Sequence, residues 1–368
     1  FDPVDDEGNF RKSTDFIAGL NIKDADKPIV QRLKEEGKMF RHETVQHSYP
    51  FCWRTDTPLI YKPISTWFVN VEAFKERMVA HNRTVHWVPG HIRDGRFGKW
   101  LENARDWAIS RNRFWGTPLP IWKNEDGDIL CFGSVAELEG AVGQVIPDLH
   151  KQHVDDLVIE RDGKTYRRIP EVLDCWFESG SMPYAQEHYP FENKTVFEAN
   201  FPADFICEGL DQTRGWFYTL AVLGSALFDV PAFKNCIVNG LILAEDGKKM
   251  SKRLKNYPDP NEMLDQYGAD AIRLYMLNSP AVRGEDLRFS EKGLIETTRQ
   301  LLLPLWNALA FLTTYARIDG WEPTDDNLAV SAKNALDRWI LSCLQRLIAE
   351  VQKQMDLYDL NRSVAPFV

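Results

Sequence analysis

Two apolar runs, each followed by a polar turn and a helix-like pattern, constrain the fold of this chain most strongly. Residues 236–244 (CIVNGLILA) are apolar and β-branched, as in a buried strand, and residues 261–275 have helical spacing with Asn261 as a candidate N-cap. Residues 203–207 (ADFIC) repeat the arrangement before an apolar helix expected over 212–227. Strand followed by helix is the unit of a parallel sheet, whose ligands bind beyond the carboxyl ends of the strands. We therefore expect an α/β fold.

Composition limits what this fold can do. The chain has 368 residues and is 44% hydrophobic, enough for two or three packed units. Its net charge of -10 argues against a protein that binds nucleic acid over its whole surface, so contacts to RNA or phosphate must come from local basic patches. No uninterrupted apolar run approaches the roughly twenty residues of a membrane span, so we expect a cytoplasmic protein with no membrane partner. The cysteines lack CxxC pairs, which favours reduced, mostly buried thiols.

A basic loop separates the second strand from its helix. Residues 246–260 read DGKKMSKRLKNYPDP, an unusual concentration of Lys and Arg in an acidic chain. A solvated charge run is the ordinary interpretation of such a stretch. Its position between a core strand and a helix instead favours a polyanion, because Lys249 and Lys252 can converge on a phosphate chain while Ser251 offers a hydroxyl.

Two further segments carry polar groups at strand ends. Residues 207–216 (CEGLDQTRGW) place two carboxylates, an amide and an arginine at a strand-to-helix switch. Helix capping would explain Asp211 alone but not the whole set. Residues 173–181 (LDCWFESGS) are expected to be a strand that ends in a small flexible turn, and Trp176 taken alone is more often a core residue than a pocket residue.

In this order the segments resemble the class I aminoacyl-tRNA synthetases. Residues 249–253 (KMSKR) match the KMSKS signature of that family with Arg in the last place. LDCWFESGS, EGLDQTRGWF and NGLILAEDGKKMSKRLKNYPDP look like the isoleucyl-tRNA synthetases of the eukaryotic cytosolic type. HSYPFCWR and ARDWAISRNRFWGTPLPIW support the match nearer the amino end.

The resemblance implies the C-terminal half of a Rossmann-like parallel sheet with connecting insertions, followed by an α-helical domain. Residues 1–63 would be the C-terminal remnant of an editing insertion and 64–168 connecting segments. Residues 169–295 would be the second half of the catalytic domain with the basic loop and the stem-contact region, and 296–368 the start of a helical anticodon-binding domain. We expect an internal fragment that lacks the HIGH-bearing part and does not activate isoleucine by itself.

The resemblance also implies an activity and its residues. The activity is ATP-dependent activation of L-isoleucine and its transfer to tRNA(Ile), with ATP and Mg²⁺. The implied residues are Lys249 and Lys252 for catalysis; Lys249, Met250, Ser251, Lys252 and Gly240 for ATP; Glu208, Gly209, Asp211 and Gln212 for the aminoacyl-adenylate; and Trp176 and Trp216 for the isoleucine side chain. The alternatives are a non-catalytic tRNA-binding paralogue and a valyl-tRNA synthetase, and membership of a multi-synthetase complex stays open.

Several motifs depart from the family pattern or only imitate a site. Asn239 precedes Gly240 where many bacterial members have histidine, which leaves a histidine contact to the nucleotide in doubt. Thr55 stands three residues after Cys52, and Cys131 lacks a partner, so we expect no zinc and no metal held by the protein itself.

Three other stretches have simpler interpretations. His150, His153 and Asp155 are better explained as a polar loop than as a metal site. Residues 162–165 (DGKT) resemble the end of a P-loop but lack its leading glycine. Residues 86–93 (HWVPGHIR) only superficially resemble the HIGH signature.

Overall fold

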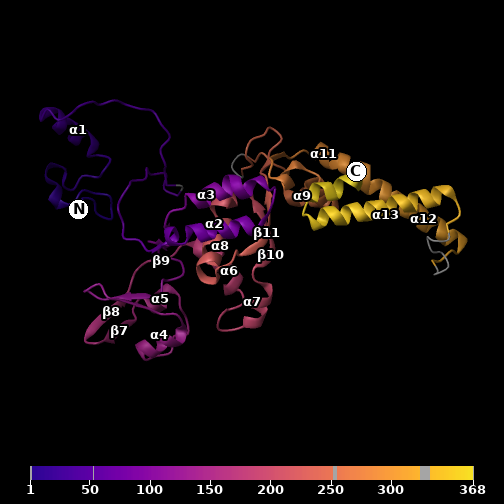
Figure 1. Cartoon of the computed structure of the whole chain (residues 1–368). Helices are drawn as coiled ribbons and strands as arrows, with labels where there is room; N and C mark the ends of the chain where they lie inside the picture. Colours follow the sequence, from indigo (N-terminus) through magenta and orange to yellow (C-terminus); the bar gives the residue numbers. More distant parts are fainter. Residues whose placement is uncertain (1, 53, 252–254, 324–331, 368) are drawn as a thin grey trace. The chain divides into compact units, whose positions relative to one another are not determined.

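The computed structural model describes residues 2–52, 54–251, 255–323 and 332–367. The chain divides into two compact units, Phe1–Trp67 and Phe68–Val368 (Figure 1). The first unit contains helix α1 (Asp26–Glu35) and a 3₁₀ turn at Lys12–Ile17. Its described residues form isolated bridges but no strand.

A parallel sheet of three strands forms the centre of the second unit. Its strand order is β10 (Ala203–Gly209), β11 (Phe233–Asn239) and β2 (His86–Val88). Both pairings are parallel, which confirms the expected α/β fold and its strands. The run over 236–244 does not continue as one strand, because β11 ends at Asn239 and β12 (Ile242–Leu243) pairs with β13 (Leu287–Arg288).

Strand β2 comes from the part of the sequence that we grouped with connecting segments. Trp87 on this strand is buried, and its ring lies 4.8 Å from that of Phe97 and 5.8 Å from that of Phe217. Residues 71–104 thus share one core with the sheet and helix α8 (Trp216–Leu223). The sequence pattern missed this because a strand of three residues is too short to show a period.

Helices cover the sheet and pack closely on one another. Helices α2 (Lys75–Thr84), α3 (Gly98–Glu102) and α8 contribute residues to the core of the sheet, α6 (Cys175–Ala185) packs on α8, and α7 (Lys194–Asn200) precedes β10. The expected flexible turn after residue 173 is wrong, because Asp174 caps α6 and the segment continues as a helix. The helix expected over 212–227 is divided into a 3₁₀ turn at Leu210–Arg214, α8, and a π turn at Gly224–Phe228.

A second, antiparallel sheet has its own core. Its strand order is β6 (Ile129–Cys131), β5 (Ile121–Lys123), β8 (Lys164–Arg168) and β7 (Val158–Arg161), next to α4 (Val135–Val142) and α5 (Lys151–Val154). Trp122, Ile159 and Tyr166 belong to its buried cluster, which shares no residue with the core of the parallel sheet. The P-loop-like DGKT is the β7–β8 hairpin turn, with φ of 53° at Asp162 and 72° at Gly163.

Two short antiparallel pairs precede and follow this second sheet along the chain. They are β1 (Phe68–Val69) with β3 (Trp107–Ala108), and β4 (Ser110–Arg111) with β9 (Val172–Leu173). The β4–β9 pair brackets the whole antiparallel sheet in sequence.

The carboxyl-terminal part is helical, as expected from about residue 296. The helices are α9 (Pro260–Tyr267), α10 (Ala269–Leu277), α11 (Glu291–Thr297), α12 (Leu303–Asp319), α13 (Ala335–Asp356) and α14 (Leu360–Val364). Asn261 is not the N-cap of α9: the Asp259 carboxylate accepts the backbone N–H of Asn261 at 2.8 Å. An aspartate two residues earlier supplies the same acceptor and leaves Pro260 at the first helical position.

The helical run Glu291–Asp319 carries many exposed apolar side chains. It spans 29 residues and contains an apolar window of 18, so its length and composition would allow a membrane span. Leu305, Trp306 and Phe311 are more than half exposed, and none of the apolar window is buried. The core helix of a soluble protein has the same length and composition.

We predict that Gly180→Ala destabilises the α6–α8 contact. A β-carbon there would lie 2.9 Å from Cβ of Thr219 and 3.0 Å from Cδ1 of Leu223, and overpacking of this kind costs about 1–3 kcal/mol. The control is Gly140→Ala in α4, where a β-carbon meets nothing within 4 Å and the helix should gain about 0.5–1 kcal/mol. Urea unfolding followed by circular dichroism measures both changes. Equal midpoints for the two variants would contradict the close packing.

Candidate functional site

The carboxyl ends of β10 and β11 bring two of the predicted segments together. In the register of the sheet Glu208 pairs with Val238 and Gly209 with Asn239. The Asn239 side chain is turned toward β10, where its Nδ2 donates to Sγ of Cys207 at 3.2 Å. The Glu208 side chain is exposed. This edge is where a parallel sheet binds ligands.

The turn after β10 holds its carboxylate and its amide in different ways. A β-carbon on Gly209 would lie 2.7 Å from Oδ1 of Asp211, so the glycine makes room for that carboxylate. Gln212 accepts the backbone N–H of Trp216 at 3.0 Å and donates to Asp211 at 3.4 Å. Gln212, and not Asp211, therefore satisfies the first N–H of α8. Glu208 and Asp211 are left as two exposed carboxylates.

The arginine of the same segment belongs to a packing contact. The guanidinium of Arg214 lies over the ring of Trp100, 5.0 Å from its centroid. Next to it, Arg96 donates to Oγ1 of the buried Thr213 at 3.0 Å. Arg214 is therefore a weaker ligand candidate than its place in the sequence indicates.

The two predicted pocket tryptophans make different contacts between α6 and α8. Trp176 on α6 is 40% exposed, and a β-carbon on Gly215 would lie 3.0 Å from its ring. Trp216 donates its indole N–H to the carbonyl of Ser179 at 2.9 Å. A cavity of about 70 Å³ is lined by Trp216 together with Met182, Phe197, Phe201 and Leu220, but not by Trp176.

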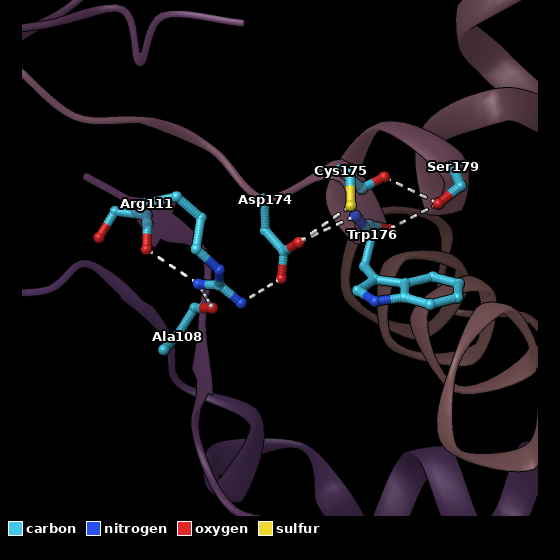
Figure 2. A network of polar contacts seen from close by, with 7 residues as sticks. Ala108, Arg111, Asp174, Cys175, Trp176 and Ser179 are labelled. Carbon is cyan, nitrogen blue, oxygen red and sulfur yellow. Dashed lines mark hydrogen bonds and ion pairs between the residues drawn. The ribbon is translucent and has the colours of Figure 1, made fainter. Parts of the chain in front are cut away.

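An ion pair that the sequence analysis did not find stands at the start of α6 (Figure 2). Arg111 on β4 pairs with Asp174, whose side chain is only 5% exposed. The other carboxylate oxygen of Asp174 accepts the backbone N–H of Trp176 at 3.1 Å. The two residues are 63 positions apart, and no spacing rule connects them.

The basic loop is held at its base by the asparagine of its NYPDP end. Asn256 accepts the backbone N–H of Ser251 at 2.9 Å and donates to the carbonyl of Lys249 at 3.2 Å. The Lys249 side chain is exposed, and Met250 packs against the apolar cluster that contains Met263 and Phe289. The predicted catalytic residue Lys252 lies outside the described residues.

Close backbone packing explains the glycine before the loop. A β-carbon on Gly240 would overlap the carbonyl of Glu285, and the Gly240 N–H donates to the carbonyl of Ala281 at 2.7 Å. The glycine is therefore required by the fold whether or not its backbone approaches a nucleotide.

The cysteines and histidines are the remaining candidates for a metal site. The six cysteines are free; Cys236 is buried, whereas Cys131 and Cys175 are exposed, so the expectation of mostly buried thiols is wrong. Burial raises the pKa of Cys207 and Cys236 above the usual value for a thiol. Within the described ranges no group of three or more His, Cys, Asp or Glu side chains could hold a metal ion. His150 and His153 both contact Asp148 instead.

Residues 10–289 match the family model described as tRNA synthetases class I (I, L, M and V). The chain belongs to the class I tRNA synthetases. It is 61% identical over 366 residues to an isoleucine–tRNA ligase of Protochlamydia amoebophila and 59% identical over 367 residues to one of Chlamydia trachomatis serovar L2. Each match covers 100% of this chain and 35% of the relative, so the chain spans about a third of these synthetases.

Solved class I synthetases share the fold. A Mycobacterium tuberculosis methionyl-tRNA synthetase in complex with methionyl-adenylate superposes with a TM-score of 0.58 at 19% identity, over 86% of this chain and 53% of that one. A LeuRS–tRNA–LeuAMS complex from Agrobacterium radiobacter K84 gives 0.53 at 22% identity, over 72% of this chain and 35% of that one. The sequence relatives named above are bacterial, so the resemblance to the eukaryotic cytosolic type is not supported.

We predict that Asn256→Ala loosens the basic loop of this synthetase chain. Each lost hydrogen bond is worth about 0.5–1.5 kcal/mol, which corresponds to roughly two- to tenfold faster exchange of the Ser251 amide proton. Asn261→Ala, five residues on at an exposed position, is the control and should leave that rate unchanged. Hydrogen exchange followed by NMR measures the rate. Equal rates in the two variants would show that Asn256 does not hold the loop.

Proposed function

We propose that the protein to which this chain belongs is an isoleucine–tRNA ligase of the cytoplasm. It would use ATP to activate L-isoleucine as isoleucyl-adenylate and then transfer the isoleucyl group to tRNA(Ile). The register of β10 and β11 carries the proposal, because it places Glu208 and Gly209 beside Asn239 at the ligand-binding edge of the sheet. Relatives that match over the whole chain bear this name.

The amino-acid end of the reaction is assigned to the turn after β10. Glu208, Gly209, Asp211 and Gln212 would hold the ribose and the aminoacyl part of the adenylate. The exposed carboxylates of Glu208 and Asp211 suit ribose hydroxyls and an ammonium group, which are hydrogen-bond donors. Trp176 and Trp216 would line the isoleucine side chain: the ring of Trp176 lies against Gly215, and the indole of Trp216 bonds to Ser179 on α6, the helix that carries Trp176.

The phosphate end is assigned to the basic loop. Lys249, Met250, Ser251 and Lys252, together with Gly240, would form the ATP subsite, and Lys249 and Lys252 would be the catalytic pair. The isoleucine carboxylate attacks the α-phosphorus, the bond to the bridging oxygen breaks, and pyrophosphate leaves with the electron pair. Positive charge at the loop would stabilise the charge that develops on pyrophosphate. Mg²⁺ would enter with ATP and neutralise part of the phosphate charge.

The remaining assignments follow the family order along the chain. Residues 1–63 would end an editing insertion, 64–168 would connect it to the core, 169–295 would complete the catalytic domain and contact the tRNA stem, and 296–368 would begin the anticodon-binding domain. Because β2 pairs with β11 in the parallel sheet, residues 86–88 would belong with the catalytic domain rather than with the connecting segments.

Amino-acid-dependent exchange between ATP and pyrophosphate tests this function in the full-length protein. We expect exchange with isoleucine well above exchange with valine, and isoleucylation of tRNA(Ile) transcripts. Exchange that depends on valine would identify a valyl-tRNA synthetase instead. No exchange with any amino acid, together with retained tRNA binding, would identify a non-catalytic paralogue.

We predict that Lys252→Ala slows adenylate formation far more than it weakens isoleucine binding. The reason is that its charge acts on pyrophosphate as it departs, so the interaction is stronger in the transition state than in the ground state. Pre-steady-state kinetics of the full-length protein measure both quantities. Lys234→Ala removes a lysine that is paired with Asp204 and is the control. An unchanged rate constant with a raised dissociation constant would refute this role.

We predict that Trp216→Ala reduces discrimination between isoleucine and valine. One methylene in an apolar pocket is worth about 1–3 kcal/mol, a magnitude established on this enzyme family rather than derived from this chain. The kcat/KM for pyrophosphate exchange is measured with each amino acid. If both values fall by the same factor, Trp216 supports the core around its 70 Å³ cavity and does not select the substrate.

A further inference from the structure

The ion pair between Arg111 and Asp174 joins two segments that are distant in sequence. Strands β4 and β9 pair so that Arg111 lies opposite Val172. The guanidinium donates to the carbonyls of Ala108 and Ser110 at 2.9 and 2.8 Å, and its other terminal nitrogen donates to Asp174. The backbone N–H of Asp174 donates to the carbonyl of Ile109 at 2.7 Å. Arg111 is thus committed to protein acceptors on both terminal nitrogens.

Asp174 uses its two carboxylate oxygens for different tasks. Oδ2 receives Arg111, while Oδ1 accepts the backbone N–H of Trp176 at 3.1 Å and faces the thiol of Cys175 at 3.5 Å (Figure 2). Arg111 therefore sets the orientation of the Asp174 carboxylate. This carboxylate in turn holds the backbone N–H of Trp176 in the first turn of α6. A cap alone would need only Asp, Asn or Ser at an exposed helix start. The carboxylate of this cap is buried and is paired with one terminal nitrogen of Arg111.

The same helical turn is held from its other end by α8. Ser179 donates its hydroxyl to the carbonyl of Cys175 at 2.8 Å, and the carbonyl of Ser179 accepts the indole N–H of Trp216 at 2.9 Å. Trp176 lies between these two attachments, with its ring against Gly215. Its position is thus determined by Asp174 on one side and by α8 on the other.

We propose that Arg111 and Asp174 are positioning residues that fix the ring of Trp176 in the amino-acid site. This rests on the proposed function, in which Trp176 lines the isoleucine side chain. A partly buried ion pair contributes little net stability compared with apolar packing, but this one is directional. One terminal nitrogen of Arg111 is held by the carbonyls of Ala108 and Ser110, and the other donates to Oδ2 of Asp174, which leaves Oδ1 for the N–H of Trp176. Loss of Arg111 leaves the carboxylate free to rotate away from the N–H of Trp176. The ring of Trp176 then shifts relative to Gly215, and the discrimination between isoleucine and valine falls.

The test compares Arg111→Met with Arg105→Met in the full-length protein. Arg105 forms an ion pair with Glu72 but its side chain is 82% exposed, so this control removes the same charge at the surface. We expect Arg111→Met to reduce the isoleucine-to-valine ratio of kcat/KM at least about fivefold, which is part of the discrimination that one methylene provides in an apolar pocket. Arg105→Met is expected to leave the ratio unchanged. A lower melting temperature with an unchanged ratio would show that the pair is only structural and would overturn the proposal.

A second readout does not depend on activity. Labelling with 5-fluorotryptophan gives one ¹⁹F resonance for each tryptophan of the full-length protein, the 12 of this chain among them, and Trp176→Phe assigns the one of interest. Arg111→Lys and Asp174→Asn, milder changes that keep the size of the side chains, are expected to shift or broaden the Trp176 resonance and leave those of distant tryptophans unchanged. An unmoved resonance in both variants would overturn the proposal. A wild-type protein without isoleucine-dependent exchange would refute the proposed function, while the resonance still tests the positioning.

Discussion

The parallel pairing of β10 with β11 is the constraint on which the rest of the structure depends. Parallel strands are buried on both faces and need covering helices, and α8, which follows β10, supplies one of them. The same pairing fixes which residues meet at the carboxyl edge, because a slip of one residue would turn every side chain to the opposite face. The register of the sheet therefore determines which residues lie at the site.

Glycines set the distances between the elements around this edge. Gly180 lets α6 approach α8, Gly215 admits the ring of Trp176, and Gly240 lets the strand of the basic loop touch the turn at Ala281. None of the three has a positive φ, and at each a β-carbon would meet a neighbouring atom within 3.0 Å, so the requirement is space. Substitution at these positions would displace whole elements and not only a local side chain.

The sequence predicted the strand at 203–207 and part of β11, within a longer run expected over 236–244, because apolar runs are local signals. The site role of Glu208 and Asp211 stays a prediction. The sequence did not predict β2, whose three residues are too short to show a period, or the helix over 175–185, where Gly180 and Pro183 disguise helical spacing. The Arg111–Asp174 pair could not be predicted, since only the fold brings its members together. Asn256 was visible as part of a motif, but its two backbone contacts were not.

The antiparallel sheet of β5 to β8 is bracketed by β4 and β9, and its buried cluster is separate from that of the parallel sheet. Such an arrangement has an evolutionary consequence. Residues can be added or removed between β4 and β9, for example at the Asp162–Gly163 hairpin, without disturbing the core that holds β10 and β11. Natural variation in the length of this segment should therefore be concentrated in its loops, and the two strands that join it to the rest should change least.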